Sequence, residues 1–171
     1  DSGAKGVMIP LINTRNEAKS VVDSVKYPPI GKRGVFGNRG SKFGLIPTAE
    51  QIKLSNKEIF VSVQIETKQS VKNQDEIIKT EGIDAIFLGP GDLSVSLGVP
   101  GEMMHNKVIE TMNPIVENAL KNGKHVGTLG LDLDQAKYWH NKGVNWLVAS
   151  SQRFLISGTK NYIDNVKKPL I

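Results

Sequence analysis

The sequence contains no cysteine, which excludes disulfides, thiolate metal sites and cysteine nucleophiles. It also lacks a signal-peptide pattern and any apolar run of the ~20 residues that a membrane-spanning helix needs. Aromatic residues make up only 6% of the chain and do not alternate with basic residues, as a platform for stacking bases would require. We therefore expect no nucleic-acid or membrane partner, and a reducing, cytoplasmic location.

The remaining composition is typical of a soluble globular protein. The chain has 171 residues, of which 39% are hydrophobic and 23% charged. Its net charge is +5, but the lysines and arginines are spread along the sequence. This pattern favours a solvated basic surface that attracts small anions. We expect residues 1–171 to form a single domain.

Short apolar runs alternate with stretches of helical spacing along the whole chain. Strands are predicted at 6–10, 59–65, 85–88, 125–129 and 146–150, with a possible sixth strand near Val35. Helices are predicted between Thr14 and Tyr27 and at 51–56, 70–79, 93–97, 106–122, 132–142 and 154–168. Such alternation predicts an α/β fold with a parallel sheet covered on both faces. An open doubly wound sheet and a (β/α)8 barrel both fit, and the chain would supply about six of a barrel's eight units.

Two carboxylates follow consecutive predicted strands. Glu66 comes directly after the strand at 59–65, and Asp92 follows the strand at 85–88. Neighbouring parallel strands lie about 4.8 Å apart, so two carboxylates at their ends can share a hard cation such as Mg²⁺ or Mn²⁺. Two other roles stay open at this point. Glu66 could cap a helix or form a salt bridge, and Asp92 could be a helix N-cap.

The glycine-rich basic stretch at 30–47 is predicted to be a loop. Its glycines do not form a Walker motif, so substrate or subunit contact and a solvated flexible loop both stay open. The three histidines, His105, His125 and His140, show no metal-ligand spacing, and we expect them to be structural.

Several motifs resemble the HpcH/HpaI aldolase family. They are V-Q-I-E-T at 63–67 and E-G-I-D-A-I-F-L-G-P-G-D-L-S at 81–94, together with D-S-G-A-K-G-V-M-I-P at 1–10 and Y-P-P-I-G-K-R-G-V at 27–35. The resemblance implies a (β/α)8 TIM barrel of the phosphoenolpyruvate/pyruvate type. It also implies that residues 1–171 are the C-terminal part of the barrel, with the N-terminal two β/α units absent.

The same resemblance implies a function. It indicates a class II aldolase that reversibly cleaves a 4-hydroxy-2-oxo acid, such as 2-dehydro-3-deoxyglucarate or 4-hydroxy-2-oxoheptanedioate, to pyruvate and an aldehyde. Glu66 and Asp92 would bind Mg²⁺, Mn²⁺ or Co²⁺. The substrate-binding positions would be Gln64 and the loop Gly89, Pro90 and Gly91. The protein would be a homo-oligomer, a hexamer or a dimer-based assembly, with its last helix packed on a neighbouring subunit.

The chain departs from the family pattern in several places. The family's base histidine and its substrate-binding arginine are expected before Asp1, so no acid–base residue is identified in this chain. Two alternatives therefore stand beside the aldolase: a non-catalytic fragment that retains a metal site, and a CoA-ester lyase of the citrate-lyase β type. A fragment with two open sheet edges is also expected to be unstable as a monomer.

Overall fold

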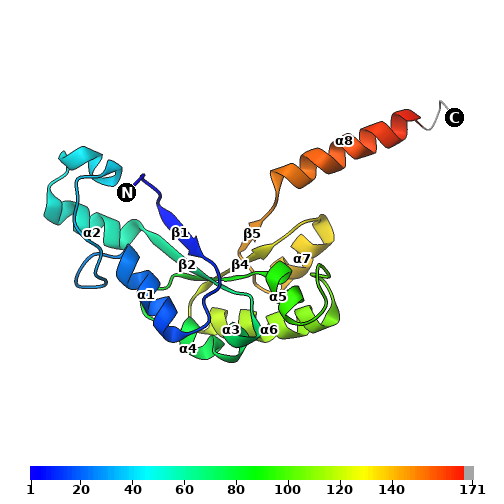
Figure 1. Cartoon of the computed structure of the whole chain (residues 1–171), viewed down its shortest axis with the longest axis horizontal. Coiled ribbons are helices and arrows are strands. Elements are labelled where there is room, and N and C mark those ends of the chain that lie inside the picture. The colour runs from blue at the N-terminus through cyan, green and yellow to red at the C-terminus, as the bar shows by residue number, and fades with distance from the viewer. Residues whose placement is uncertain (168–171) are drawn as a thin grey trace.

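The computed structural model describes residues 1–167 and is built on one parallel sheet. Its strands are β1 (Gly6–Ile9), β2 (Phe60–Ile65), β3 (Ala85–Leu88), β4 (His125–Leu129) and β5 (Trp146–Val148). Each strand pairs with the next one in the sequence, which gives the order β1-β2-β3-β4-β5. The sheet curls between its edge strands β1 and β5, so the fold is α/β with a half-barrel of parallel strands (Figure 1).

Helices connect the strands. They are α1 (Arg15–Val25), η1 (Arg39–Gly44, a 3-10 helix), α2 (Thr48–Glu58), α3 (Lys68–Lys72), α4 (Gln74–Ile78), α5 (Pro90–Ser96), α6 (Asn106–Lys121), α7 (Leu133–Asn141) and α8 (Ser151–Lys167). Figure 1 shows α1, α3, α4 and α6 along one face of the sheet, while α8 extends away from the rest of the fold. Within the described residues no helix is long and apolar enough to cross a membrane.

The hydrophobic core lies between the sheet and these helices. Alternate residues of a strand point to opposite faces, so one set of strand side chains meets the apolar faces of the helices. The sheet contributes Val61, Val63, Ile65, Ile86, Leu88 and Val126, and the helices contribute Ala18, Val22, Ile77, Ile78, Met112, Ile115 and Trp139. Burying each such side chain contributes about 1.5–3 kcal/mol, so this face fixes the position of the strand ends.

The opposite face of the sheet carries aromatic side chains. Phe87 and Trp146 meet edge to face with 5.3 Å between ring centroids, and Phe60 lies 5.9 Å from Trp146. Gly127 lies between the first two rings, and a Cβ there would be 2.7 Å from an atom of each. A glycine is therefore required on β4 for this cluster to form. Within residues 1–167 aromatic side chains therefore cover part of the concave face.

The possible sixth strand near Val35 does not form. The backbone N–H groups of Lys32 and Arg33 donate to the carbonyls of Asp23 (2.7 Å) and Lys26 (3.0 Å). The segment therefore folds back on the end of α1 instead of reaching a sheet edge, and Val35 is left 53% exposed. The described residues thus hold five strands, one fewer than the upper estimate from the sequence.

Helix boundaries differ from the prediction at a few places. The helix expected at 70–79 is divided at Asn73, whose side chain donates to the backbone carbonyl of Asn13 (2.7 Å). Helix α2 begins earlier than expected, directly after Pro47. Helix α8 begins at Ser151, three residues before its predicted start, and its predicted end at 168 lies outside the described residues.

Candidate metal centre

The two predicted carboxylates come from adjacent strand ends, as the sequence suggested. Ile65 of β2 pairs with Leu88 of β3, so the next residues along the two strands, Glu66 and Gly89, lie opposite each other. Asp92 is in the first turn of α5, the helix that begins directly after Gly89. Parallel strands place their carboxyl ends at one edge, which is where α/β enzymes bind ligands.

The Glu66 side chain is buried, with 2% of its surface exposed. One carboxylate oxygen, Oε1, accepts a hydrogen bond from the backbone N–H of Leu11 at 2.7 Å. The other, Oε2, accepts a longer one from the Gln64 side-chain amide at 3.3 Å. One donor from the loop after β1 and one from β2 thus orient this carboxylate.

Gly89 provides the space that Glu66 occupies. A Cβ at position 89 would lie 2.2 Å from Oε2 of Glu66, closer than any non-bonded contact allows. The backbone N–H of Gly89 donates to the carbonyl of Ile65, which keeps the two chain segments together. The motif Gly-Pro-Gly-Asp therefore begins with a glycine because a carboxylate lies against its backbone.

The surroundings of Glu66 make its charged form less favourable than that of a carboxyl group in water. Burial raises the pKa of the Glu66 carboxyl, the Leu11 N–H opposes that rise, and the negative charge of Asp92 raises the pKa further. Among the described residues, none of the ion pairs includes Glu66 or Asp92. A buried carboxylate and a nearby like charge with no cationic side chain make an arrangement that a bound cation would stabilise.

The alternative roles considered for the two carboxylates do not fit the geometry. The residue that caps α3 is Thr67, whose hydroxyl accepts from the N–H of Ser70, so Glu66 is not an N-cap. The N-cap position of α5 is Gly89, without a side-chain capping bond, so Asp92 is not an N-cap either. Helix capping and salt bridging therefore do not explain either carboxylate.

The donor set fits a hard divalent cation. Glu66 and Asp92 offer carboxylate oxygens, and the carboxamide of Gln64 lies beside Glu66. Residues 1–167 contain no group of three or more His, Cys, Asp or Glu side chains around one point. The protein would thus supply two carboxylates and leave other coordination positions to water and substrate oxygens, as is common for Mg²⁺.

The other predicted site residues line the same edge of the sheet. Gly89 and Pro90 are buried and Gly91 is partly exposed where β3 turns into α5. The Ser94 hydroxyl donates to the carbonyl of Gly91 (2.6 Å) and accepts from the N–H of Gly101 (2.9 Å). These bonds fix the loop that carries Asp92.

Sequence reasoning missed Leu11, which donates to Glu66 from a left-handed backbone conformation, φ 56°. Leucine rarely adopts this conformation, so no pattern in the sequence points to it. Two of the three histidines make contacts within the fold. His105 caps α6 through Nδ1, and His125 lies 3.1 Å from the side-chain amide of Asn145.

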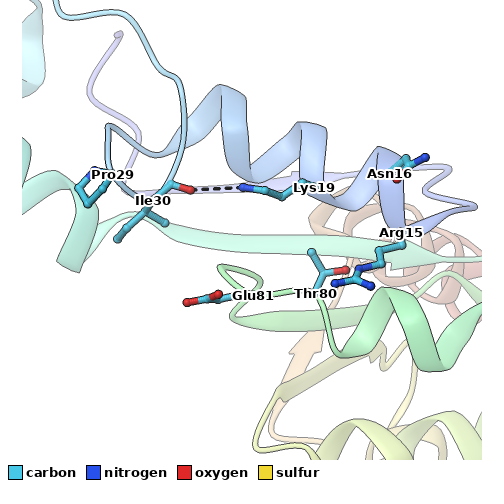
Figure 2. Close-up of a pocket in the computed structure, with 7 residues that line it drawn as sticks. All are labelled: Arg15, Asn16, Lys19, Pro29, Ile30, Thr80 and Glu81. Atoms are coloured by element: carbon cyan, nitrogen blue, oxygen red, sulfur yellow. Dashed lines mark hydrogen bonds between the residues drawn. The ribbon is translucent and has the colours of Figure 1, made fainter.

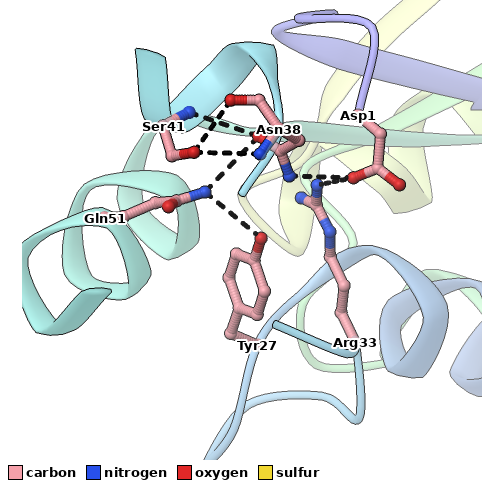
Figure 3. A network of polar contacts seen from close by, with 6 residues as sticks. All are labelled: Asp1, Tyr27, Arg33, Asn38, Ser41 and Gln51. Atoms are coloured by element: carbon pink, nitrogen blue, oxygen red, sulfur yellow. Dashed lines mark hydrogen bonds and ion pairs between the residues drawn. The ribbon is translucent and has the colours of Figure 1, made fainter. Parts of the chain in front are cut away.

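The glycine-rich loop is held by a polar network. Arg33 forms an ion pair with Asp1 at 2.7 Å, and its guanidinium lies 4.6 Å from the ring centre of Tyr27. The Gln51 side chain contacts the Tyr27 hydroxyl and the side chain of Asn38 (Figure 3). The loop is therefore tied to α2 and to the start of the chain, and Arg33 is engaged in structure instead of being free for a phosphate.

A cavity of about 510 Å³ lies away from the carboxylates. It is lined by Arg15, Asn16, Lys19, Pro29, Ile30, Thr80 and Glu81, between α1 and the segment before β3 (Figure 2). Lys19 is already paired with Asp23 at 2.7 Å, and all of the lining residues except Thr80 are exposed. The cavity is therefore a hollow among mostly exposed side chains and contains neither Glu66 nor Asp92.

Comparison with known proteins agrees with the fold and the motifs. The chain is 38% identical over 170 residues to 5-keto-4-deoxy-D-glucarate aldolase of Escherichia coli O157:H7, covering 98% of this chain and 66% of that protein. It superimposes on the crystal structure of an HpcH/HpaI aldolase from Desulfitobacterium hafniense with a TM-score of 0.87 at 32% identity, covering 97% of this chain and 65% of that one. The chain thus spans slightly less than two-thirds of the length of these relatives.

A more distant structure shares the fold. It is the citrate lyase beta subunit of M. tuberculosis, complexed with oxaloacetate and magnesium, with a TM-score of 0.53 at 15% identity over 85% of this chain and 55% of that one. The model of the HpcH/HpaI aldolase/citrate lyase family matches residues 1–152. On this match, and on its identity to the aldolases, the chain belongs to the HpcH/HpaI aldolase/citrate lyase family.

Proposed function

We propose that this chain is the C-terminal part of a (β/α)8 barrel of the phosphoenolpyruvate/pyruvate type. Eight strands would require three more than the five described here, not the two expected from the sequence. The buried Ser62 hydroxyl supports this proposal, because it has no hydrogen-bond partner within residues 1–167. Ser62 alternates with the core residues of β2 and so lies on the concave face, where a side chain of a further strand would supply a hydrogen-bond partner.

We infer that the complete protein is an aldolase that reversibly cleaves a 4-hydroxy-2-oxo acid to pyruvate and an aldehyde. The observation that carries this function is the buried Glu66 carboxylate beside Asp92, without a cationic side-chain partner in the described residues. Relatives at 37–38% identity are named 5-keto-4-deoxy-D-glucarate aldolase, which supports a sugar-acid substrate of that kind.

The chain's own residues would divide the work as follows. Glu66, held by Leu11 and Gln64, and the exposed Asp92 would hold a divalent cation. When bound, such a cation supplies Lewis-acid polarisation of a 2-oxo group and stabilises negative charge on its oxygen. The backbone of Gly89 to Gly91 would lie against the substrate carboxylate.

Cleavage breaks the bond between C3 and C4 of the substrate. The C4 hydroxyl loses its proton to a base and becomes the aldehyde, while the bonding electrons pass into the pyruvate enolate, which takes up a proton at C3 to give pyruvate. The family's base histidine and arginine match no residue of this chain, so the residues present here account for binding and charge stabilisation but not for the proton transfer.

A coupled assay tests the proposal. The chain is expressed together with any coding sequence that adjoins it, and pyruvate release from 2-dehydro-3-deoxyglucarate is followed with lactate dehydrogenase. We expect release with Mn²⁺ or Mg²⁺ and none after treatment with EDTA. Release that is unaffected by EDTA would refute a metal-dependent aldolase. Metal binding without turnover of any 4-hydroxy-2-oxo acid would instead favour a non-catalytic protein that retains the metal site.

A second candidate is a CoA-ester lyase of the citrate-lyase β type. The family model covers both classes, and the magnesium-bound citrate lyase beta subunit shares the fold at a TM-score of 0.53. Identity to that protein is 15%, against 38% to the aldolase, so we place this candidate second. Cleavage of a 3-hydroxyacyl-CoA thioester to a shorter acyl-CoA and a carbonyl product, without pyruvate formation from the sugar acid, would reverse the order.

We also propose that the protein is a homo-oligomer assembled through α8. This helix buries none of its described residues, and its exposed apolar side chains include Phe154, Leu155, Ile156, Tyr162 and Ile163. We expect light scattering to give a mass of at least a dimer, and L155K together with I156K to shift the protein toward the monomer. K160S, a polar change on the same helix, is the control. A wild-type protein that is monomeric at tens of micromolar would contradict the assembly.

A further inference from the structure

We propose that Leu11 is a positioning residue for Glu66, acting through its backbone and not through its side chain. Leu11 lies in the loop between β1 and α1 and adopts φ 56°, the left-handed region. Its N–H donates to Oε1 of Glu66 at 2.7 Å. The unusual backbone conformation and the shorter of the two hydrogen bonds to the carboxylate therefore fall on the same residue. This proposal rests on the proposed metal-dependent function.

The side chain of Leu11 does not explain its conformation. It is 56% exposed, so burial does not drive it into place. Left-handed backbone in a non-glycine residue persists only where the surroundings hold it, and such positions gather at functional sites. The left-handed conformation directs the Leu11 N–H toward Oε1 of Glu66.

Neighbouring residues hold the loop in this conformation. The Asn13 side-chain amide donates to the carbonyl of Leu11 at 2.9 Å, and its carbonyl oxygen accepts from the hydroxyl of Thr67, the residue after Glu66. The backbone carbonyl of Asn13 accepts from the Asn73 amide at 2.7 Å. Asn13 thus ties the loop after β1 to the end of β2, where the metal carboxylate lies.

The loop is also fixed from its other end. The carboxylate of Glu17 accepts from the N–H groups of Asn13 (2.6 Å) and Thr14 (2.9 Å), and the Thr14 hydroxyl caps α1. The segment from Leu11 to Thr14 is therefore restrained at both ends. A change that alters the backbone at Leu11 would turn its N–H away from Glu66 and leave a buried carboxylate with a single, longer hydrogen bond.

The test compares two substitutions of Leu11, one that disfavours the left-handed region and one that adopts it. Isoleucine is β-branched and strongly disfavours it, whereas glycine adopts it freely. We expect L11I to raise the dissociation constant for Mn²⁺, measured by calorimetry and by the Mn²⁺ EPR signal, by about tenfold or more. L11G should keep the wild-type constant, because it retains the N–H and loses only an exposed side chain.

Phe43 provides a matched control. It also has a positive φ, 58°, it is 78% exposed, and it lies in η1. F43I imposes the same backbone conflict away from Glu66, so it should lower thermal stability without changing the Mn²⁺ constant. Equal Mn²⁺ affinity of L11I, F43I and the wild type would overturn the proposal.

A readout without metal separates this proposal from the proposed function. In the metal-free wild type, the Leu11 amide should exchange slowly with solvent deuterium, and its protection should fall in E66A. Rapid exchange in the wild type would overturn the positioning role whether or not metal binds. A wild type that shows this protection but binds no Mn²⁺ would refute the metal site and leave the hydrogen bond standing.

Discussion

Replacing Glu66 with glutamine is expected to abolish metal-dependent aldolase activity and at the same time to stabilise the metal-free protein. Activity should fall by at least about a hundredfold, because Glu66 is the buried one of the two proposed metal ligands and is oriented by the Leu11 N–H. In EDTA, however, the unfolding temperature should rise by roughly 2–4 °C, since a buried carboxylate without a cationic partner in the described residues is replaced by a neutral side chain of similar shape. Pyruvate release and thermal unfolding in EDTA measure the two effects.

The stabilisation in EDTA should depend on pH in a defined direction. Burial raises the pKa of Glu66, so the folded metal-free protein binds this proton more tightly than the unfolded chain does. The wild type therefore gains stability as the pH falls through the raised pKa, and the advantage of E66Q should shrink at acidic pH and be fully present at pH 8. The control is E58Q, because Glu58 is exposed and paired with Lys5. Loss of stability in E66Q at pH 8 without metal would contradict the assignment of an unpaired buried carboxylate.

The substitution G89A is expected to weaken metal binding although it replaces neither of the two carboxylates. The new Cβ would lie 2.2 Å from Oε2 of Glu66 and 2.9 Å from its Cβ, so Glu66 must move. The backbone of Gly89 has φ −91°, which alanine tolerates, and the whole effect is therefore steric. We expect Mn²⁺ affinity to fall by at least about a hundredfold and the free energy of unfolding to fall by about 1–3 kcal/mol.

Gly91 provides the matched control for G89A. It lies two residues further along the same loop, and a Cβ there would meet no atom within 4 Å. G91A should therefore leave Mn²⁺ affinity and thermal stability close to those of the wild type. A double-mutant cycle of G89A with E66A should show that the two substitutions are not additive, because they remove the same contact. Additive effects on stability would mean that the cost of G89A arises elsewhere.

The sequence predicts the positions of the carboxylates well, for a physical reason. Glu66 and Asp92 follow apolar runs that can only be buried strands, and parallel topology then brings the strand ends together. The prediction fails where a short apolar pair is not part of the sheet. Val35 and Phe36 look like a strand, but the adjacent glycines and the backbone bonds to α1 leave them exposed.

The contacts that orient Glu66 could not be predicted in the same way. Leu11 enters the site through a backbone conformation that its residue type disfavours, and only the tertiary contacts of Asn13 select it. Gly127 is another example. The need for glycine at this position follows only from the packing of Phe87 and Trp146 against each other across β4. Both features depend on residues that are distant in sequence, which periodicity and propensity do not describe.

The strictly sequential order of the strands also bears on how the protein forms during synthesis. Every strand pairs with its predecessor, so each new β/α unit can add to an edge that has already emerged from the ribosome. The hydrogen bonds to Glu66 and those that fix the loop of Asp92 involve only residues 11 to 101. The proposed cation site is thus specified by the part of this chain that is translated first, whereas β4, β5 and α8 are added afterwards.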